Sequence, residues 1–423
     1  MMSVPKIMIG YSKQNINKTD IKSVLKILGS DFLTQGPKVE KFEKILADYC
    51  GAKFAVAVAN GTAALHLGCL ALGLKNGDEH WTSAVSFVAS ANCGIYCASK
   101  PDFIDISLDD FNLDLNYLET KLKKAKVKKR LPKVIIPVHF AGLPCDMAGL
   151  NFLANKYDFK IIEDACHSLG AEYKIKDKWH KIGDCSFSDL VCFSFHPVKT
   201  ITTGEGGAIL TNNKELYEKL LMLRSHGIIK DSSKFLYTSN NQYISLNSCF
   251  YNNSYKLKNI NNIILPKQCY YEMQELGFNY RITDIQCALG LSQLSRINKF
   301  LKKRQQISEY YRNKLSDLVL FQKINNDKYK SSNHLVVILT KKRNELFEYL
   351  KKNKILCQIH YIPIYRHPFY QKKYKFKISD FPNSEKYFLE CLSIPCYYDL
   401  SKSELNFIIK KIIEFNKTQI LKK

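Results

Sequence analysis

The chain has 423 residues, 46% of them hydrophobic, and is long enough for one large and one smaller domain, each with its own core. Fourteen cysteines show neither a CxxC pair nor regular spacing, which excludes a small disulfide scaffold and indicates reduced, mostly buried thiols in a cytosolic protein. Lysine and arginine number 63 against 39 acidic residues, a formal net charge of +24.

The basic charge comes in runs, at residues 121–130, 302–304 and 372–377. Nucleic-acid binding is one interpretation, and solvated helix faces in a lysine-rich protein are the other. Because aromatic residues do not interleave with these lysines as one module, we expect no nucleic-acid partner. The charge would still favour the capture of anionic ligands.

Residues 81–99 carry no charge over nineteen positions, a length that suits a membrane helix. Their many Ser, Thr, Asn and Cys residues argue against a spanning segment. Residues 1–15 contain no apolar core of signal-peptide length. We therefore expect a cytoplasmic protein without a membrane partner.

The first elements alternate between helix and strand. Thr19 is the predicted N-cap of a helix that Gly29 ends, and a second apolar helical pattern ends at Gly51. Residues 54–59 form an apolar strand that runs into Asn60-Gly61-Thr62, followed by a further helix. A strand, a tight glycine turn and a helix can hold a phosphate at the helix N-terminus.

Further strands are predicted at residues 133–138, 159–162 and 191–195. Strands that alternate with helices indicate a mainly parallel sheet with helices on both faces. Ligands bind at the carboxyl ends of such strands, where Asn60, Asp164 and Ser194 lie.

Residues 228–271 are rich in Asn, Ser and Tyr and show no helical or strand period. We interpret them as an inserted long loop that borders the active-site mouth, although a tolerated surface loop would look the same. The predicted organisation is an N-terminal arm (1–20), a large domain (21–297) and a small C-terminal α+β domain (298–423).

Lys199 follows an apolar strand and precedes the Gly-rich run 204–207, a poor place for an ordinary surface charge and a suitable one for a Schiff base with an aldehyde. The turn at residues 60–62 could cradle a phosphate, and the run 163–167 could hold a pyridinium nitrogen. Together these features predict a pyridoxal-phosphate site.

The combination resembles the DegT/StrS-type sugar aminotransferases, from about Tyr11 to the C-terminus. The resemblance also includes the runs Leu33-Thr34-Gln35-Gly36-Pro37, Ser86-Phe87-Val88-Ala89-Ser90-Ala91-Asn92, Arg224-Ser225-His226-Gly227, Asn279-Tyr280-Arg281-Ile282-Thr283-Asp284 and 358–365. It implies an α/β fold of the fold-type-I PLP-dependent transferases, with a mainly parallel sheet flanked by helices and a smaller C-terminal α+β domain.

By this resemblance Lys199 is the catalytic residue, and its amine must be neutral to react. It would also shuttle the proton between the amino acid and the cofactor. Asp164 would pair with the pyridine nitrogen, with helix capping as the alternative, while Glu163 would point to the opposite face of the strand. His167 would lie beside the ring or its phenolic oxygen, unless it is an ordinary core histidine.

The resemblance assigns the cofactor phosphate to Gly61, Thr62 and Ser194. Phe87 would stack on the ring face, or else be an ordinary core aromatic. Asn279 would reach the phosphate from the neighbouring subunit, which implies a homodimer with shared active sites.

The implied substrates are L-glutamate and a UDP-sugar. The amine would pass to C4 of a UDP-linked 4-keto-6-deoxy-N-acetylhexosamine, giving UDP-4-amino-4,6-dideoxy-N-acetyl-beta-L-altrosamine for pseudaminic acid synthesis. The implied substrate contacts are Tyr11, Asp31, Phe32, Leu33, Thr34, Asn60, Gly61, Ser194, Asn279, His360, Tyr361, Ile362, Pro363 and Tyr365. The alternatives are another nucleotide-linked keto sugar, or a cofactor-binding regulator without turnover. The sequence indicates no metal site.

Overall fold

The computed structural model describes residues 8–236, 239–240, 243–246, 263–266 and 269–420. Its centre is a seven-stranded sheet in the order β1-β9-β8-β5-β4-β2-β3. Strand β9 is antiparallel to both of its neighbours, and the other adjacent pairs run parallel. The strands are β1 (Phe54–Val58), β2 (Glu79–Ser83), β3 (Lys100–Ile104), β4 (Val134–Ile136), β5 (Lys160–Asp164), β8 (Leu190–Ser194) and β9 (Gly207–Thr211). The predicted α/β architecture is confirmed.

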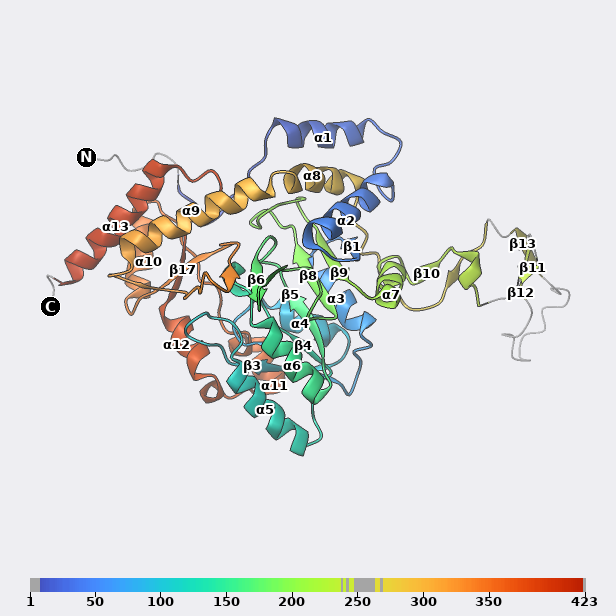
Figure 1. Ribbon diagram of the computed structural model, residues 1–423, viewed down its shortest axis with the longest axis horizontal. Helices are drawn as coiled ribbons and strands as arrows, with labels where there is room; N and C mark the ends of the chain where they lie inside the picture. The colour runs from blue at the N-terminus through green and yellow to red at the C-terminus, as the bar shows by residue number, and fades with distance from the viewer. Residues whose placement is uncertain (1–7, 237–238, 241–242, 247–262, 267–268, 421–423) are drawn as a thin grey trace.

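Helices cover both faces of the sheet (Figure 1). Alternation along β1 shows why: Ala55 and Ala57 join one apolar core, whereas Val56 and Val58 join the other. The helices of this part are α1 (Lys18–Leu28), α2 (Pro37–Cys50), α3 (Gly61–Ala71), α4 (Ala89–Tyr96), α5 (Leu115–Val127), α6 (Met147–Tyr157), α7 (Lys214–Arg224) and α8 (Asp284–Leu294). A small antiparallel sheet of β6 (Glu172–Ile175), β7 (Lys178–Lys181) and β16 (Tyr329–Lys330) lies beside them.

The C-terminal part contains a three-stranded antiparallel sheet, in the order β15-β17-β18, and helices that share a separate apolar core. Ile9, from the predicted N-terminal arm, lies in this core and forms a bridge with Ile355. The elements are α9 (Ile297–Leu315), β15 (Leu320–Phe321), β17 (Val336–Leu339), α10 (Arg343–Lys352), α11 (Pro368–Tyr374), α12 (Pro382–Glu390), β18 (Cys391–Ile394) and α13 (Lys402–Ile420).

Local signals set most helix ends. Gly51 ends α2 in the left-handed conformation, and Thr283 caps α8. The expected N-cap at Thr19 is wrong by two residues, because Asn17 occupies that position. The Asn17 side chain accepts from the amides of Thr19 and Asp20, and the Asp20 carboxylate accepts from the Asn17 amide.

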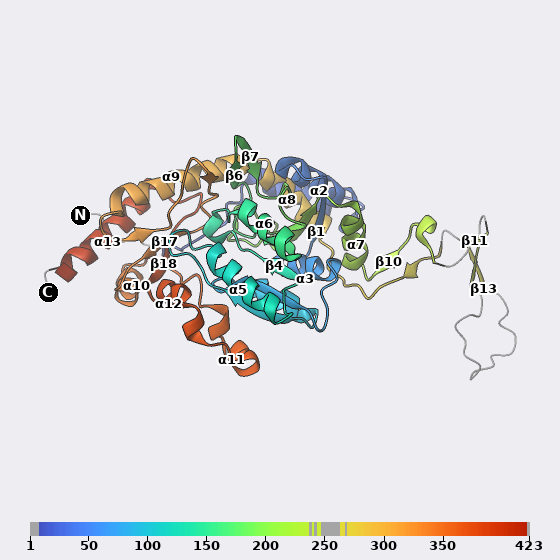
Figure 2. The same ribbon diagram turned by 60° about the horizontal axis from the view of Figure 1, so that its bottom comes forward.

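The expectation that residues 228–271 lack strand structure is wrong for the part that is described. β10 (Ile228–Ile229) pairs with β14 (Glu272–Met273), and β11 (Ser239–Asn240), β12 (Tyr243–Leu246) and β13 (Ile263–Pro266) form a small sheet. Both ribbon views show β10 and the small sheet of β11, β12 and β13 extending away from the body (Figures 1 and 2). Short antiparallel pairs leave little alternation in a sequence.

The cysteines that the structure describes are free thiols, buried except for Cys166 and Cys269. Within the described ranges no helix is both long and apolar enough to cross a bilayer. The uncharged run 81–99 instead forms part of β2 and the buried helix α4.

Candidate active site

A cavity of about 450 Å³ lies at the carboxyl ends of the central strands. Strands β1, β5 and β8 each deliver residues to it, as expected for parallel strands that end at one edge. Its lining residues are Tyr11, Asn60, Gly61, Thr62, Leu65, Ser86, Phe87, Ala89, Val138, Asp164, Cys166, His167, Ser194, His196, Val198, Lys199, Glu205, His334, His360 and Tyr361.

Lys199 lies in a tight turn after β8, where its amide donates to the carbonyl of His196 at 2.9 Å. Burial lowers the pKa of its amine, and the buried Arg304 guanidinium adds to this effect, whereas Cys166 and Asp164 oppose it. Arg304 also lines the small hollow on a second side of Lys199. A lowered pKa increases the neutral fraction of the amine, the form that attacks an aldehyde.

Asp164 ends β5 with its carboxylate buried at the cavity. Its Oδ2 accepts a hydrogen bond from the Ser90 hydroxyl at 2.6 Å, and its Oδ1 accepts from the amide of Cys166 at 3.2 Å. The Ser86 hydroxyl lies 2.7 Å from that of Ser90. The residues after Asp164 form turns rather than a helix, so the carboxylate holds a turn and does not cap a helix.

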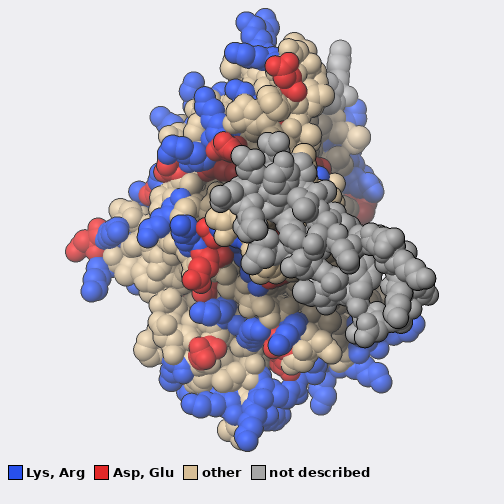
Figure 3. Space-filling view, turned by 90° about the vertical axis from the view of Figure 1, so that its right-hand side faces the viewer, with Lys and Arg blue, Asp and Glu red and all other residues tan. Residues whose placement is uncertain are grey.

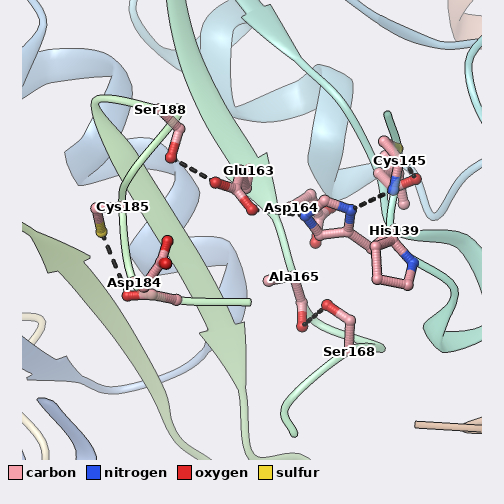
Figure 4. A network of polar contacts seen from close by, with 12 residues as sticks. His139, Cys145, Glu163, Asp164, Ala165, Ser168, Asp184, Cys185 and Ser188 are labelled. Atoms are coloured by element: carbon pink, nitrogen blue, oxygen red, sulfur yellow. Dashed lines mark hydrogen bonds and ion pairs between the residues drawn. The ribbon is translucent and has the colours of Figure 1, made fainter. Parts of the chain in front are cut away.

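Glu163 belongs to a separate buried network (Figure 4) and does not line the cavity. Its carboxylate accepts from His139 Nε2 at 2.7 Å and from the Ser188 hydroxyl. Because His139 Nδ1 accepts from the amide of Cys145 at 3.0 Å, its proton lies on Nε2. These hydrogen bonds connect β5 to the neighbouring segments that carry His139 and Ser188. Asp164 is therefore the carboxylate of this pair that lines the cavity.

The start of α3 forms a cradle for a phosphate. The Asn60 side chain accepts from the amide of Ala63 at 2.8 Å, which leaves the amides of Gly61 and Thr62 as the remaining donors of the first turn. A Cβ atom on Gly61 would lie 2.8 Å from the Cβ of Ser194 and 3.2 Å from Cys166 Sγ. Only glycine therefore lets the helix start approach Ser194 this closely.

Among the histidines that line the cavity, burial lowers the pKa of His360 to about 3 and those of His167 and His334 well below the usual range. The rings of His167 and His334 are 4.5 Å apart, and Nδ1 of each is buried without a partner among the described residues. His167 Nε2 lies 3.1 Å from the hydroxyl of Tyr361. The cavity thus keeps neutral imidazoles with unused hydrogen-bonding capacity.

Sequence analysis missed His334, Ser86 and Ser90. The two serines stand in the run 86–92 that carries the resemblance, so that run contained a signal. His334 directly precedes the apolar strand residues 335–339, and a single histidine before a strand gives no signal on its own.

Eight residues of the predicted set do not line the cavity of their own chain: Asp31, Phe32, Leu33, Thr34, Asn279, Ile362, Pro363 and Tyr365. Tyr365 is fully buried, and its hydroxyl donates to Glu385 at 2.7 Å. Phe87 lines the cavity and is 56% exposed, so it is not an ordinary core aromatic.

The segment 31–38 is fastened to the segment 279–284. The Asp284 amide donates to the carbonyl of Leu33 at 3.0 Å, and its buried carboxylate accepts from the amides of Gly36 and Lys38 at 2.7 and 2.8 Å. Thr34 and Thr283 form an antiparallel bridge. These two parts of the predicted site therefore form one structural unit outside the cavity of their own chain.

Comparison with known proteins agrees with this geometry. The profile of the DegT/DnrJ/EryC1/StrS aminotransferase family matches residues 14–413. The chain belongs to this family. A UDP-4-amino-4,6-dideoxy-N-acetyl-beta-L-altrosamine transaminase from Campylobacter jejuni is 38% identical over 408 residues, which is 95% of this chain and 96% of the relative.

Two solved structures are similar over nearly the whole chain. Helicobacter pylori PseC, an aminotransferase involved in the biosynthesis of pseudaminic acid, is 30% identical with a TM-score of 0.81, covering 97% of this chain and 100% of that one. The PMP form of the putative sugar aminotransferase Spr1654 from Streptococcus pneumoniae is 26% identical with a TM-score of 0.82, covering 97% and 99%.

The family establishes a transaminase that uses pyridoxal phosphate, on a fold of type I. The cavity fits that cofactor on three points: a lysine with a lowered pKa, a buried carboxylate for a protonated ring nitrogen, and a helix N-terminus for the phosphate. The spare Nδ1 of His167 provides a further contact within the same cavity.

Proposed function

We propose that this aminotransferase moves the amino group of L-glutamate to C4 of a UDP-linked 4-keto-6-deoxy-N-acetylhexosamine, forming UDP-4-amino-4,6-dideoxy-N-acetyl-beta-L-altrosamine for pseudaminic acid synthesis. The observation that carries the proposal is one cavity in which Lys199, Asp164 and the start of α3 meet. The transaminase relative of that activity, which matches 95% of the chain, supports the choice of sugar.

Pyridoxal phosphate, when bound, supplies an aldehyde that takes up the amino group and a ring that accepts electrons from the substrate carbon. Lys199 Nζ would hold the aldehyde, and as a free amine it would take up the proton that leaves the glutamate Cα. Its lowered pKa suits both tasks, because the free amine must act as a base near neutral pH.

The other residues bind and orient. Asp164, held by Ser90 and the Cys166 amide, pairs with the protonated ring nitrogen. Gly61, Thr62 and Ser194 would hold the phosphate, Phe87 would stack on the ring, and the neutral imidazole of His167 would donate or accept a hydrogen bond there.

Sugar-nucleotide contacts come from both ends of the chain. The rings of Tyr11 and His360 lie 5.3 Å apart at the cavity, and Tyr361 reaches His167. A neutral His360 donates one hydrogen bond, which suits a diphosphate oxygen. Ile362 and Pro363 continue this segment, and the buried Tyr365 supports it from behind.

We propose that Asp31–Thr34 and Asn279 act in the active site of a second copy of the chain. Because the two segments are bonded to each other, a single dimer contact would place both of them in the partner's site. The surface beside them supports it, because α1 buries Asp20 and exposes Ile21, Leu25 and Leu28 by 51, 59 and 55%. A helix with its apolar side outward fits a subunit interface.

A spectral titration tests the proposal. Wild type and Lys199→Ala are mixed with pyridoxal phosphate, then with L-glutamate, then with the UDP-4-keto-6-deoxy-N-acetyl sugar. We expect a lysine-dependent absorbance band that glutamate bleaches and the keto sugar restores. Recovery only with another nucleotide-linked keto sugar would keep the aminotransferase and replace the sugar. A bound cofactor that responds to neither substrate would favour the regulator instead.

A further inference from the structure

A strongly basic surface lies at the edge of the central sheet opposite the active site. It joins the C-terminal end of α5, the start of β3 and the loop after α11, and we call it the basic edge. Its exposed cationic residues are Lys100, Lys123, Lys124, Lys126, Lys128, Lys129, Arg130, Lys375 and Lys377. Lysine and arginine side chains gather along the lower rim of the molecule in Figure 3, where α5 lies in Figure 1.

Two adjoining hollows run along the basic edge. They have volumes of about 470 and 380 Å³ and share Asp102, Tyr117, Lys121, Arg130 and Asp380. The Tyr117 hydroxyl donates to the carbonyl of Asp380 at 3.0 Å, which links α5 to the loop after α11. Residues 263 positions apart in the sequence are therefore joined in one continuous surface.

The acidic residues beneath the basic edge are largely neutralised. Asp102 pairs with Lys121 at 2.7 Å, and Glu79 pairs with Arg130. Among the described residues no carboxylate lies within ion-pair distance of Lys100, Lys124, Lys128, Lys375 or Lys377, and Asp380 alone remains as an exposed acid on the shared floor. The basic edge thus carries an excess of unpaired positive charge. The lysines repel one another, and binding to an anionic surface would relieve that repulsion.

Exposed aliphatic side chains stand among these lysines. Val127 is 87% exposed between Lys126 and Lys128, and Ile378 is 41% exposed directly after Lys377. Lysines beside protruding aliphatic tips match the boundary of an anionic bilayer, where the charges meet headgroups and the tips enter the acyl region.

Nucleic acid fits less well. Single-stranded nucleic acid is bound by exposed aromatic faces on which bases stack. Of the aromatic residues that line the hollows, Trp81 and Phe381 are 1 and 2% exposed. The others, Tyr117, Tyr374 and Phe376, are half-buried and pack against neighbouring rings. Binding to a phosphate backbone would also leave the exposed side chain of Val127 without an apolar partner.

We propose that the basic edge docks the enzyme peripherally on an anionic lipid bilayer. Glu79 begins β2 and Lys100 begins β3, so this surface lies at the amino ends of strands whose sheet bears the active site at its carboxyl ends. Docking there leaves the cavity open to water-borne substrates. The proposal replaces the sequence-based expectation that the chain has no membrane partner, and it involves no spanning helix.

The test is co-sedimentation of the cofactor-loaded enzyme with vesicles of phosphatidylcholine, alone or with about 30% phosphatidylglycerol. We expect binding only to the anionic vesicles. Each lysine near such a surface contributes about fivefold, so Lys124→Glu/Lys128→Glu should weaken binding by at least about 25-fold. The matched control is Lys299→Glu/Lys302→Glu on α9, which makes the same charge change at two exposed lysines elsewhere and should keep most of the binding.

Val127→Ser separates insertion from charge alone, and we expect binding to fall severalfold without a change in net charge. The cofactor absorbance of all variants should equal that of wild type, because these side chains are exposed and unpaired. Their Tm should stay within a few degrees of wild type, since a charge change near a helix end alters the free energy of unfolding only slightly. Equal losses in the α5 and α9 double variants would overturn the proposal. So would equal binding to uncharged vesicles, or tight binding of a single-stranded RNA that depends on Lys124 and Lys128 while vesicles are not bound.

Discussion

Replacing Ser90 with alanine tests how the carboxylate of Asp164, the proposed partner of the cofactor's ring nitrogen, is held in place. The Ser90 hydroxyl donates to Asp164 Oδ2 at 2.6 Å in a buried setting, and after its removal the carboxylate keeps the longer 3.2 Å bond from the Cys166 amide. A hydrogen bond to a charged group contributes about 1.5–3 kcal/mol. If that free energy supports the ion pair with the ring nitrogen, the glutamate half-reaction should slow by about 10- to 150-fold.

The matched control is Ser168→Ala. Ser168 is equally buried, lies in the turn after β5 and donates at 3.2 Å to a neutral acceptor, the carbonyl of Ala165 (Figure 4). It loses the same hydroxyl without touching Asp164, at a cost of about 1 kcal/mol of stability. The glutamate half-reaction should therefore stay close to the wild-type rate.

The assay is stopped-flow absorbance of the bound cofactor after glutamate is added, with Tm measured for each variant. A slow half-reaction in Ser90→Ala, with a Tm near that of Ser168→Ala, supports a positioning role. Equal half-reaction rates in the two serine variants would refute the reasoning, because the bond to Asp164 would then contribute nothing beyond packing.

Three further predictions follow from burial and from the proposed second subunit. The pKa of His80 is lowered to about 4 and that of His360 to about 3, from 6.5, because burial disfavours their charged forms. Below pH 6.5 the unfolded chain therefore binds more protons than the folded one. The free energy of unfolding, measured in urea, should decrease as the pH is lowered, by about 2 kcal/mol for each histidine between pH 7 and pH 5. An unchanged free energy of unfolding would contradict this. A heterodimer of Lys199→Ala and Asn279→Ala chains should regain about half of the wild-type activity, because one of its two sites would be intact; no recovery in a purified heterodimer would remove the shared-site proposal. Tyr365→Phe should lower Tm through the lost bond to Glu385 while the KM for the sugar nucleotide stays constant, and a raised KM would instead place the hydroxyl on the substrate.

Much of the fold follows from local signals. Gly51 takes a left-handed conformation that glycine favours, and Thr283 with Gln286 closes a capping box, so both helix ends were predictable. The choice between Asn17 and Thr19 was not, because either side chain can cap and the acidic partner Asp20 decides it. The strands within residues 228–271 were not predicted, because short strands can pair without an alternating apolar pattern in the sequence.

The site divides in the same way. Asp164 and Ser194 were predictable because parallel strands end at one edge, and that edge gathers whatever follows each strand. His334 was not, because it reaches the cavity from the C-terminal part through packing between elements far apart in sequence. The sequence pattern predicts which residues follow each strand, but it does not predict which side chain from a distant part of the chain packs against the cavity.

The attachment of residues 31–38 to residues 279–284 bears on the proposal that Asp31–Thr34 and Asn279 act together in a second copy of the chain. Asp284 caps the turn at Gly36 with its carboxylate and fixes Leu33 with its amide, so the two stretches share one set of bonds. A stretch exchanged alone between relatives would face foreign partners and lose its position. An exchange of either proposed contact segment between related enzymes would therefore keep its backbone position only if the other segment were exchanged with it.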